Sequence, residues 1–295
     1  MTPISTLNFI QQRLLRKTSV GHAIVTIAMM TAGGLGCSST ASAQETNIPG
    51  ISAVDGDFAK KDGWDITAGG GLAVMPTYEG SDRDRITPVP FVRAVYDDMF
   101  SFGVDGLSAY WHQNGLRIGA SLVYGAARKD YESNGIIQSG DNRLNGLGDI
   151  NGAAGLKLFG SYNVGRLNLS TAVTKYEGSD NKGVIADLGA NLPFRLSDKL
   201  MVTAHVGATW ANGEYMETFF GVTPTQSADS GFSEFTAHAG VKDVDAGLRA
   251  DYRLDQHWFV STNIGVKRLE GDAAKSPITF ANTEGTFMTV LGYRF

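Results

Sequence analysis

One pentapeptide with the chemistry of a cation site occurs twice in this chain of 295 residues. Tyr-Glu-Gly-Ser-Asp stands at residues 78–82 and again at 176–180, and supplies the carboxylates Glu79, Asp82, Glu177 and Asp180. Carboxylate oxygens are preferred ligands of Ca²⁺, but the D-x-D-x-D-G spacing of a calcium loop is absent. Gly, Ser and Asp are also ordinary turn residues. We therefore expect two turns, with an acidic cation site as the alternative.

Residues that could support catalysis or nucleic-acid binding are scarce. Of the five histidines only His205 lies in the middle of an alternating segment, and no Gly-x-Ser-x-Gly or His-Glu-x-x-His motif is present. A histidine base needs a nucleophile within hydrogen-bond reach, and no pattern supplies one. The single cysteine excludes thiolate metal clusters, and the net charge of −5 gives no basic footprint for nucleic acid. We predict no enzyme activity, no metal and no cofactor.

Charged residues at every second position are a third candidate feature. Asp245, Arg249, Asp251 and Arg253 share one face of segment 244–254, whose other face is apolar. Residues of the same kind in other alternating segments are Asp187, His205, Lys267 and Arg294. Together they predict either a selective pore or an internal salt-bridge network that fills a narrow interior.

The elements that must position these charges are strands of about ten residues. Segments 116–125, 200–210, 244–254 and 287–295 alternate apolar with polar or small residues, and no stretch after residue 43 approaches 18 consecutive apolar residues. This pattern is typical of a transmembrane β-barrel, with lipid on the apolar face and a polar lumen on the other. We predict an all-β fold, an antiparallel up-and-down transmembrane β-barrel over residues 64–295.

Turn lengths set the expected number of strands. Short turns fall at 96–98, 113–115, 163–165, 197–199 and 255–257, and long polar links at 76–85, 129–149, 177–183, 212–240 and 269–285. Bacterial barrels have short periplasmic turns and longer extracellular loops. The two classes alternate regularly if 99–112 holds two short strands that turn at Asp105–Gly106. We predict twelve strands, with ten as the alternative because Met99–Val104 is too short to span a bilayer.

Aromatic residues predict two girdles at the levels of the lipid head groups. The periplasmic set is Trp64, Tyr96, Trp111, Tyr162, Tyr252, Trp258 and Tyr293. The outer set is Tyr78, Tyr176 and Trp210.

The last strand carries a further pattern. Phe287, Leu291, Tyr293 and Phe295 share one face of the segment that ends the chain. A final strand of this kind resembles the signal that the bacterial outer-membrane assembly machinery recognises, so we expect these residues to have that role.

The first 43 residues have the pattern of a secretory signal peptide. A basic start with Arg13 and Arg16 precedes an apolar stretch, and Ala41-Ser42-Ala43 forms an A-x-A cleavage site before Gln44. A retained membrane anchor and a lipoprotein modified at Cys37 are the alternatives. Residues 44–63 are predicted to be a flexible periplasmic lead-in, as expected for a polar terminus.

Several short motifs, in their order along the chain from Trp64 to Phe295, resemble the MltA-interacting protein / OmpV family of outer-membrane proteins. They lie at 76–82, 88–90, 144–150, 210–223, 226–231 and 269–278. The resemblance implies an outer-membrane barrel without catalytic residues. In the best-known member it implies a scaffold that brings a murein-degrading lytic transglycosylase together with a peptidoglycan synthase, and other members are linked to adhesion or to osmotic or antibiotic responses.

From the residues and this resemblance we expect an outer-membrane scaffold. Its expected partners are the outer membrane with its lipopolysaccharide, the assembly machinery, and a periplasmic murein hydrolase and synthase. A narrow small-solute channel and an adhesin-like surface protein are alternatives, and a barrel hydrolase is the least favoured.

Overall fold

The computed structural model describes residues 63–125, 127–132 and 140–295. The predicted signal peptide at 1–43, with its cleavage residues Ala41, Ala43 and Gln44, lies outside the described residues. The same holds for the predicted lead-in at 44–63, except for Gly63.

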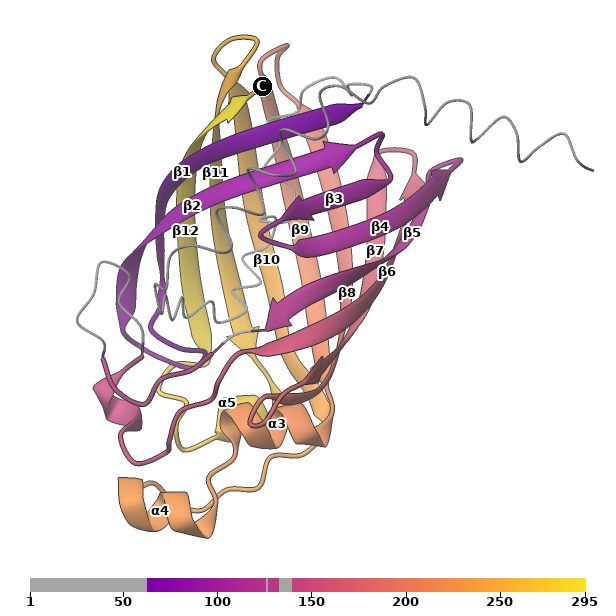
Figure 1. Cartoon of the computed structure of the whole chain (residues 1–295). Helices are drawn as coiled ribbons and strands as arrows, with labels where there is room; N and C mark the ends of the chain where they lie inside the picture. Colours follow the sequence, from indigo (N-terminus) through magenta and orange to yellow (C-terminus); the bar gives the residue numbers. More distant parts are fainter. Residues whose placement is uncertain (1–62, 126, 133–139) are drawn as a thin grey trace, which may run out of the picture. The chain divides into compact units, whose positions relative to one another are not determined.

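Twelve antiparallel strands in the described part of the chain form a closed barrel, and each strand pairs with its neighbours in the sequence (Figure 1). They are β1 (Trp64–Pro76), β2 (Asp84–Tyr96), β3 (Phe100–Gly103), β4 (Gly106–Gln113), β5 (Leu116–Gly125), β6 (Ala153–Val164), β7 (Leu167–Glu177), β8 (Lys182–Arg195), β9 (Leu200–Ala211), β10 (Gly240–Arg253), β11 (Trp258–Leu269) and β12 (Thr283–Arg294). β12 pairs with β1 and so closes the wall. The prediction of twelve strands is confirmed, and the alternative of ten is wrong.

Side chains alternate between the two faces of this wall. Large apolar residues such as Ile86 and Leu188 are 67% and 65% exposed, whereas Phe91 and Val290 are buried inside. A closed barrel pairs backbone groups between strands, which allows strands to cross hydrocarbon, and the apolar outer face meets lipid. The protein is therefore an outer-membrane β-barrel, as predicted.

The end of the barrel with short turns carries the predicted periplasmic aromatic residues. Trp64 and Tyr96 lie with ring centroids 5.1 Å apart, and Trp258 meets Tyr293 at 5.0 Å. These rings are partly exposed at the strand ends, as expected for a girdle. By the rule that periplasmic turns are short, we assign this end to the periplasm.

The outer girdle differs from its prediction. Trp210 is exposed, but Tyr78 and Tyr176 are each 1% exposed. Tyr176 lies on the inward phase of β7 and meets Tyr215, and the Tyr78 hydroxyl donates a hydrogen bond to the carbonyl oxygen of Ile278. The two tyrosines therefore belong to the interior and not to the lipid surface.

Short helices form much of the opposite end of the barrel. They are α3 (Gly213–Phe220), α4 (Pro224–Ser230), α5 (Gly271–Lys275) and the 3-10 turn η2 (Asn142–Leu144). The side chain of Asn212 accepts a hydrogen bond from the Tyr215 amide and begins α3, while Thr223 and Gln226 form a capping box at α4. None of the helices in the described residues is long and apolar enough to cross a membrane.

Candidate functional site

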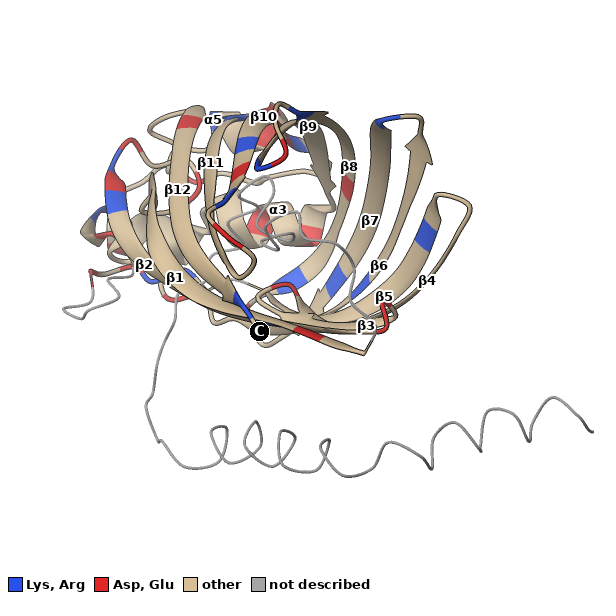
Figure 2. Cartoon of the chain, turned by 90° about the horizontal axis from the view of Figure 1, so that it is seen from above, with Lys and Arg blue, Asp and Glu red and all other residues tan. Residues whose placement is uncertain are grey.

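The outer end of the barrel is filled by loops and helices. We call this assembly the outer plug, and define it as residues 77–83, 128–132, 140–150, 212–239 and 270–282. Figures 1 and 2 show α3 across the end of the barrel, inside the ring of strands.

The centre of the outer plug is apolar. Tyr215, Met216, Phe219 and Phe220 of α3 are buried, and they form one cluster with residues of the wall such as Ile185. The last carbonyl oxygens of α3 have polar partners, as buried helix ends require. Arg128 Nη1 donates to the Phe219 carbonyl oxygen at 2.6 Å, and Ser276 Oγ donates to that of Phe220 at 2.6 Å.

Arg128 is buried where it reaches α3. Burial lowers the pKa of Arg128 to about 10, and the nearby Tyr78 and Asp130 oppose that shift. The guanidinium group therefore remains charged at neutral pH, where a cation at a helix C-terminus interacts favourably with the helix dipole.

A second apolar cluster connects the loops of the outer plug to one another. Tyr78, Leu144, Leu147, Val222 and Ile278 are buried together. These five residues come from four separate connections between strands, so their contact holds the loops over the barrel as one unit. Burial raises the pKa of Tyr78 well above its ordinary value, and its hydroxyl stays protonated.

A buried group of four charges lies beneath these clusters. Glu79 Oε1 is 2.6 Å from Lys242 Nζ and 3.0 Å from Lys267 Nζ, and Asp243 Oδ2 is 2.9 Å from Lys242 Nζ. The side chains are between 2% and 12% exposed. We call these residues the charge cluster; a third buried carboxylate, Glu284, lies near enough to interact electrostatically with Glu79 and both lysines.

Glu79 is the member of the charge cluster that comes from a loop. Burial opposes ionisation, but the charges and hydrogen bonds of Lys242 and Lys267 outweigh it and hold the pKa of Glu79 well below its ordinary value. Glu79 therefore lies in an outer loop, but its carboxylate is buried and does not lie on the outer surface. Its carboxylate is turned into the barrel because two strand lysines bind it there.

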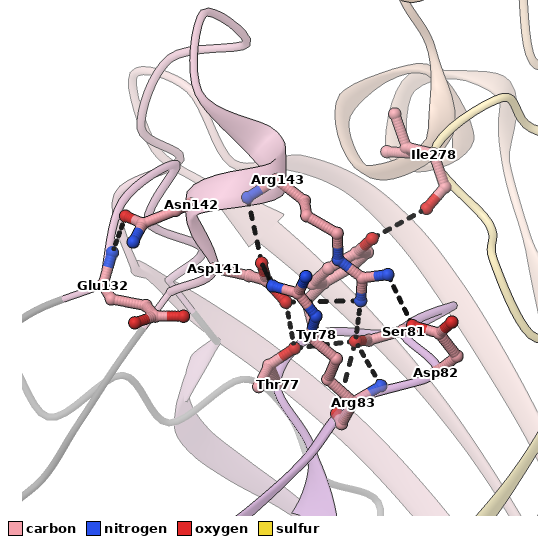
Figure 3. Close-up of polar contacts among 10 residues, drawn as sticks. All are labelled: Thr77, Tyr78, Ser81, Asp82, Arg83, Glu132, Asp141, Asn142, Arg143 and Ile278. Atoms are coloured by element: carbon pink, nitrogen blue, oxygen red, sulfur yellow. Dashed lines mark hydrogen bonds and ion pairs between the residues drawn. The ribbon is translucent and has the colours of Figure 1, made fainter.

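A second polar network fastens the β5–β6 loop to the β1–β2 loop (Figure 3). Thr77 Oγ1 donates to Asp141 Oδ2 at 2.8 Å, and Arg143 Nη2 donates to Ser81 Oγ at 2.9 Å. Arg143 also bonds Asp82. We call Thr77, Ser81, Asp82, Asp141 and Arg143 the latch.

Asp141 is the buried anion of the latch. Burial opposes its charge, but hydrogen bonds from the backbone and side chain of Arg143 and from Thr77 outweigh that effect. They hold the pKa of Asp141 below its ordinary value. The Asp141 carboxylate therefore remains charged at neutral pH.

The remaining acids of the repeated pentapeptide do not converge. Glu177 ends β7 as an exposed residue paired with Lys175 at 3.0 Å, and Asp180 accepts a hydrogen bond from Asn151. Within the described ranges no three His, Cys, Asp or Glu side chains are grouped as a metal site. The geometry gives the acidic cation site no support.

His205 lies inside the barrel with both ring nitrogens engaged. Nδ1 is 2.8 Å from Asn191 Oδ1, and Nε2 is 3.3 Å from Asp245 Oδ1. Both ring nitrogens are thus in contact with polar side chains of neighbouring strands in the wall.

The other charges expected in the lumen also have partners. Asp187 accepts a hydrogen bond from Thr209, Asp251 accepts one from Ser261, and Arg249 lies 2.9 Å from Asp251. Lys267 belongs to the charge cluster. Arg253 donates to the Asp198 carbonyl oxygen, and Arg294 pairs with Asp65, both near the periplasmic end. This pattern resembles an internal network more than a ring of free charges along a pore.

The residues of the expected assembly signal lie on the outer face of β12 or at its end. Phe287, Leu291 and Phe295 are exposed, and Tyr293 contacts the rings of Trp258 and Phe295. Their role in assembly stays a prediction.

The sequence patterns missed Lys242 and the helices. Lys242 stands at a register shift between Val241 and Asp243, where Val241 and Val244 are both exposed although three residues apart. That break in the alternation is the signal of a β-bulge. The Thr223–Gln226 capping box likewise marks the start of α4.

Comparison with known proteins adds a family to this geometry. Residues 68–295 match the family described as "MltA-interacting protein MipA". The MltA-interacting protein of Escherichia coli (strain K12) is 25% identical over 252 residues, covering 83% of this chain and 93% of that protein. The protein of the same name from Shigella flexneri gives the same values.

The similar solved structures are remote barrels. The translocator domain of the autotransporter NalP from Neisseria meningitidis has a TM-score of 0.40 at 14% identity, with 93% of this chain and 98% of that chain covered. Outer-membrane expressed OmpT of Vibrio cholerae has a TM-score of 0.36 at 9% identity, with 81% of this chain and 100% of that chain covered.

Proposed function

This chain belongs to the family described as MltA-interacting protein MipA, and from that premise we propose that it is an outer-membrane anchor for enzymes that remodel peptidoglycan. The expected partners are a periplasmic lytic transglycosylase and a murein synthase. The two relatives carry an interaction with MltA in their names. The barrel would fix the position of the enzymes, and its own residues would take no part in the chemistry.

The observation that carries this proposal is the outer plug. An open channel needs a continuous polar path, whereas here buried apolar residues and the charge cluster occupy the outer end of the barrel. Such a barrel is suited to hold a position in the membrane. The surface that remains for periplasmic enzymes is the set of short turns, together with the lead-in at 44–63.

Site-specific photocrosslinking in cells tests this proposal. A photoreactive amino acid is placed at Arg166 or at Gln256, both exposed in periplasmic turns, and at Ala228 of α4 as the control. We expect an adduct with a lytic transglycosylase from the two turn positions and none from Ala228. Loss of residues 44–63 should reduce the yield. Equal yields from Ala228 and the turns, or no adduct from either turn, would contradict the proposal.

We also propose that Phe287, Leu291, Tyr293 and Phe295 form the signal for the assembly machinery. Their outward or terminal position on β12 leaves them available before the barrel closes. Phe295→Ala should reduce the folded amount in the outer membrane, measured by heat-modifiable mobility on gels. Phe100→Ala, which truncates an exposed phenylalanine on β3, is the control.

A further inference from the structure

The barrel wall is incomplete between β2 and β5. β2 has thirteen residues, but β3 has four and pairs only with Ala94–Tyr96. Among the described residues, no strand pairs with the β3-facing edge of β2 from Asp84 to Arg93. On the other side, β4 pairs with β5 only as far as Leu122.

This gap lies within the part of the wall that crosses the membrane. A spanning strand needs about 9–11 residues, so β3 ends well short of the outer side. Neighbouring strands lie about 4.8 Å apart. Between β2 and β5 there are three such spacings (β2–β3, β3–β4 and β4–β5), so the two strands are roughly 14 Å apart beyond the ends of β3 and β4. Figure 1 shows β2 and β5 diverging beyond the β3–β4 hairpin.

The edge of β2 carries two prolines at this gap. The Tyr96 carbonyl oxygen accepts a hydrogen bond from the Met99 amide, so the polar groups of Tyr96 face β3. Alternate residues of a strand face the same neighbour, which directs the nitrogens of Pro88 and Pro90 to this edge. Proline has no N–H to donate, and natural sheet edges use it to prevent strand addition. A partner's β-strand is therefore a poor occupant.

The latch bounds the outer side of the gap. Asp141 and Arg143 follow β5 in the sequence and are bonded to Thr77 and Ser81 in the loop that precedes β2. The gap thus becomes a frame made of β2 from Asp84 to Arg93, the turn at 103–106, the end of β5 and the latch. We call this frame the window.

The outer rim of the window is apolar. Ile86 and Val92 on β2, Phe102 and Leu107 on the hairpin, and Leu122 on β5 are each more than half exposed. Side chains with this exposure on a membrane barrel contact acyl chains. A hydrocarbon tail that entered the window would therefore leave one apolar surface for another.

The inner side of the window carries a buried cation, Arg85, which interacts electrostatically with Asp141 but keeps donors without a hydrogen-bond partner. Arg85 is 9% exposed on the inward phase of β2, and its Nε and Nη1 have no hydrogen-bond partner in the described part of the structure. The Thr87 hydroxyl, two residues along the same face, also has none. Buried charges are costly unless they are paired and hydrogen-bonded, so these donors point to an anion that belongs between them.

We propose that the window admits an acyl chain from the outer leaflet and that the carboxylate or phosphate head group of that molecule binds Arg85. The tail lies in the wall between β2 and β5, and the head group accepts hydrogen bonds from Arg85 and Thr87. This site faces lipid, whereas the proposed anchor function uses the periplasmic turns. Each can fail without the other.

Photolabelling of the full-length mature protein in phosphatidylcholine nanodiscs tests the site. The probe is palmitate with a diazirine in the middle of its chain, and its uncharged methyl ester is the control probe. We expect palmitate to label 84–93 and 103–106 in excess over other lipid-facing segments, and the ester to show no such excess. Equal maps for palmitate and its ester, together with no labelling of the window by the phosphatidic acid probe described below, would overturn the proposal.

Substitution of Arg85 tests the role of the cation. A hydrogen bond to a charged group corresponds to about tenfold in affinity, so Arg85→Gln should reduce the excess labelling by about tenfold. Arg85→Lys should keep part of it, and Arg166→Gln, the same change at an exposed periplasmic turn, should keep all of it. Heat-modifiable mobility shows that each variant is folded. Unchanged labelling of a folded Arg85→Gln would overturn the proposal.

A second arm identifies the source of the head group. Phosphatidic acid with the same diazirine replaces palmitate. Labelling of the window by phosphatidic acid supports a membrane lipid as the occupant, and labelling by palmitate alone supports a free fatty acid. Absence of window labelling by both probes means that the chain itself or another molecule closes the gap, and it overturns the proposal.

Discussion

The charge cluster allows a sharp test because its loop member has a natural control in the same chain. Glu79→Gln removes the carboxylate that pairs with both lysines and leaves Lys242 and Lys267 with Asp243 and the nearby Glu284. Glu177→Gln makes the same change in the second copy of the pentapeptide, where the side chain is 73% exposed. Only the first substitution removes an anion from a buried group of charges.

The expected loss follows from the geometry. Breaking a buried ion pair by removal of one partner costs about 3–5 kcal/mol, and we take about 3 kcal/mol because Asp243 still neutralises one ammonium group. For a domain of this size 1 kcal/mol corresponds to about 2–4 °C in Tm. Glu79→Gln should therefore lower the Tm by roughly 6–12 °C, while Glu177→Gln should leave it unchanged, as is usual for exposed pairs.

The assay is thermal unfolding of the mature protein in detergent micelles, followed by circular dichroism at a fixed scan rate. A second change, Lys267→Met in the Glu79→Gln protein, should recover part of the loss, because without Glu79 Lys242 keeps its partner Asp243 at 2.9 Å whereas Lys267 lies 3.9 Å from Asp243. If Glu79→Gln unfolds at the temperature of the unmodified protein, or if Glu177→Gln loses as much, the charge cluster is not a stabilising unit and the reasoning is wrong.

Three further predictions concern the outer plug. The first concerns pH. Because the pKa of Glu79 is lowered in the folded protein, its contribution to stability is present above the ordinary glutamate pKa of about 4.3 and is lost as the pH falls through the lower folded value. Below about pH 4.3 the Tm of Glu79→Gln should therefore depend less on pH than the Tm of the unmodified protein. Gly183→Ala should displace α3, because φ is +125° at Gly183 and a Cβ would lie 2.6 Å from the Tyr215 amide nitrogen. The control is Gly285→Ala, which has open space around its Cβ and should leave α3 in place. Protease cleavage within 212–239 should increase in the first variant and not in the second. Phe220→Ala should cost about 3–5 kcal/mol and raise the conductance of single barrels in planar bilayers, whereas equal conductance before and after would mean that α3 is not what blocks the barrel.

The wall of the barrel could be predicted from the sequence because each strand records its own environment. Alternation of apolar and polar residues fixes which face meets lipid, and the short turns fix where a strand ends. Even the short hairpin of β3 and β4 followed from the need to keep short turns on one side. These are local properties of each strand, so they can be predicted without knowing which residues far apart in the sequence are in contact.

The outer plug could not be predicted because its contacts join residues far apart in the chain. Glu79 binds Lys242, 163 residues away, and the identical neighbours of Glu79 and Glu177 gave no sign of their different surroundings. Tyr176 faces inward on strand β7, and because successive side chains of a strand point to opposite faces, Glu177 faces outward. Tyr78 also faces inward, but it belongs to a loop, and the loop returns Glu79 to the interior.

The pairing of β1 with β12 differs from the other contacts in the wall, because every other pair of strands is adjacent in the sequence. Thr67 meets Arg294 and Val74 meets Phe287 across more than two hundred residues. Until these two partners meet, the chain is a curved sheet with two open edges that can pair with any extended segment nearby. Pairing β1 with β12 brings together strands separated by a longer chain segment than any other strand pair, so it has the largest entropic cost of loop closure. The pairing of β1 with β12 should therefore be the last part of the barrel to form. Until then, these two strand edges must be kept from pairing with other proteins in the cell.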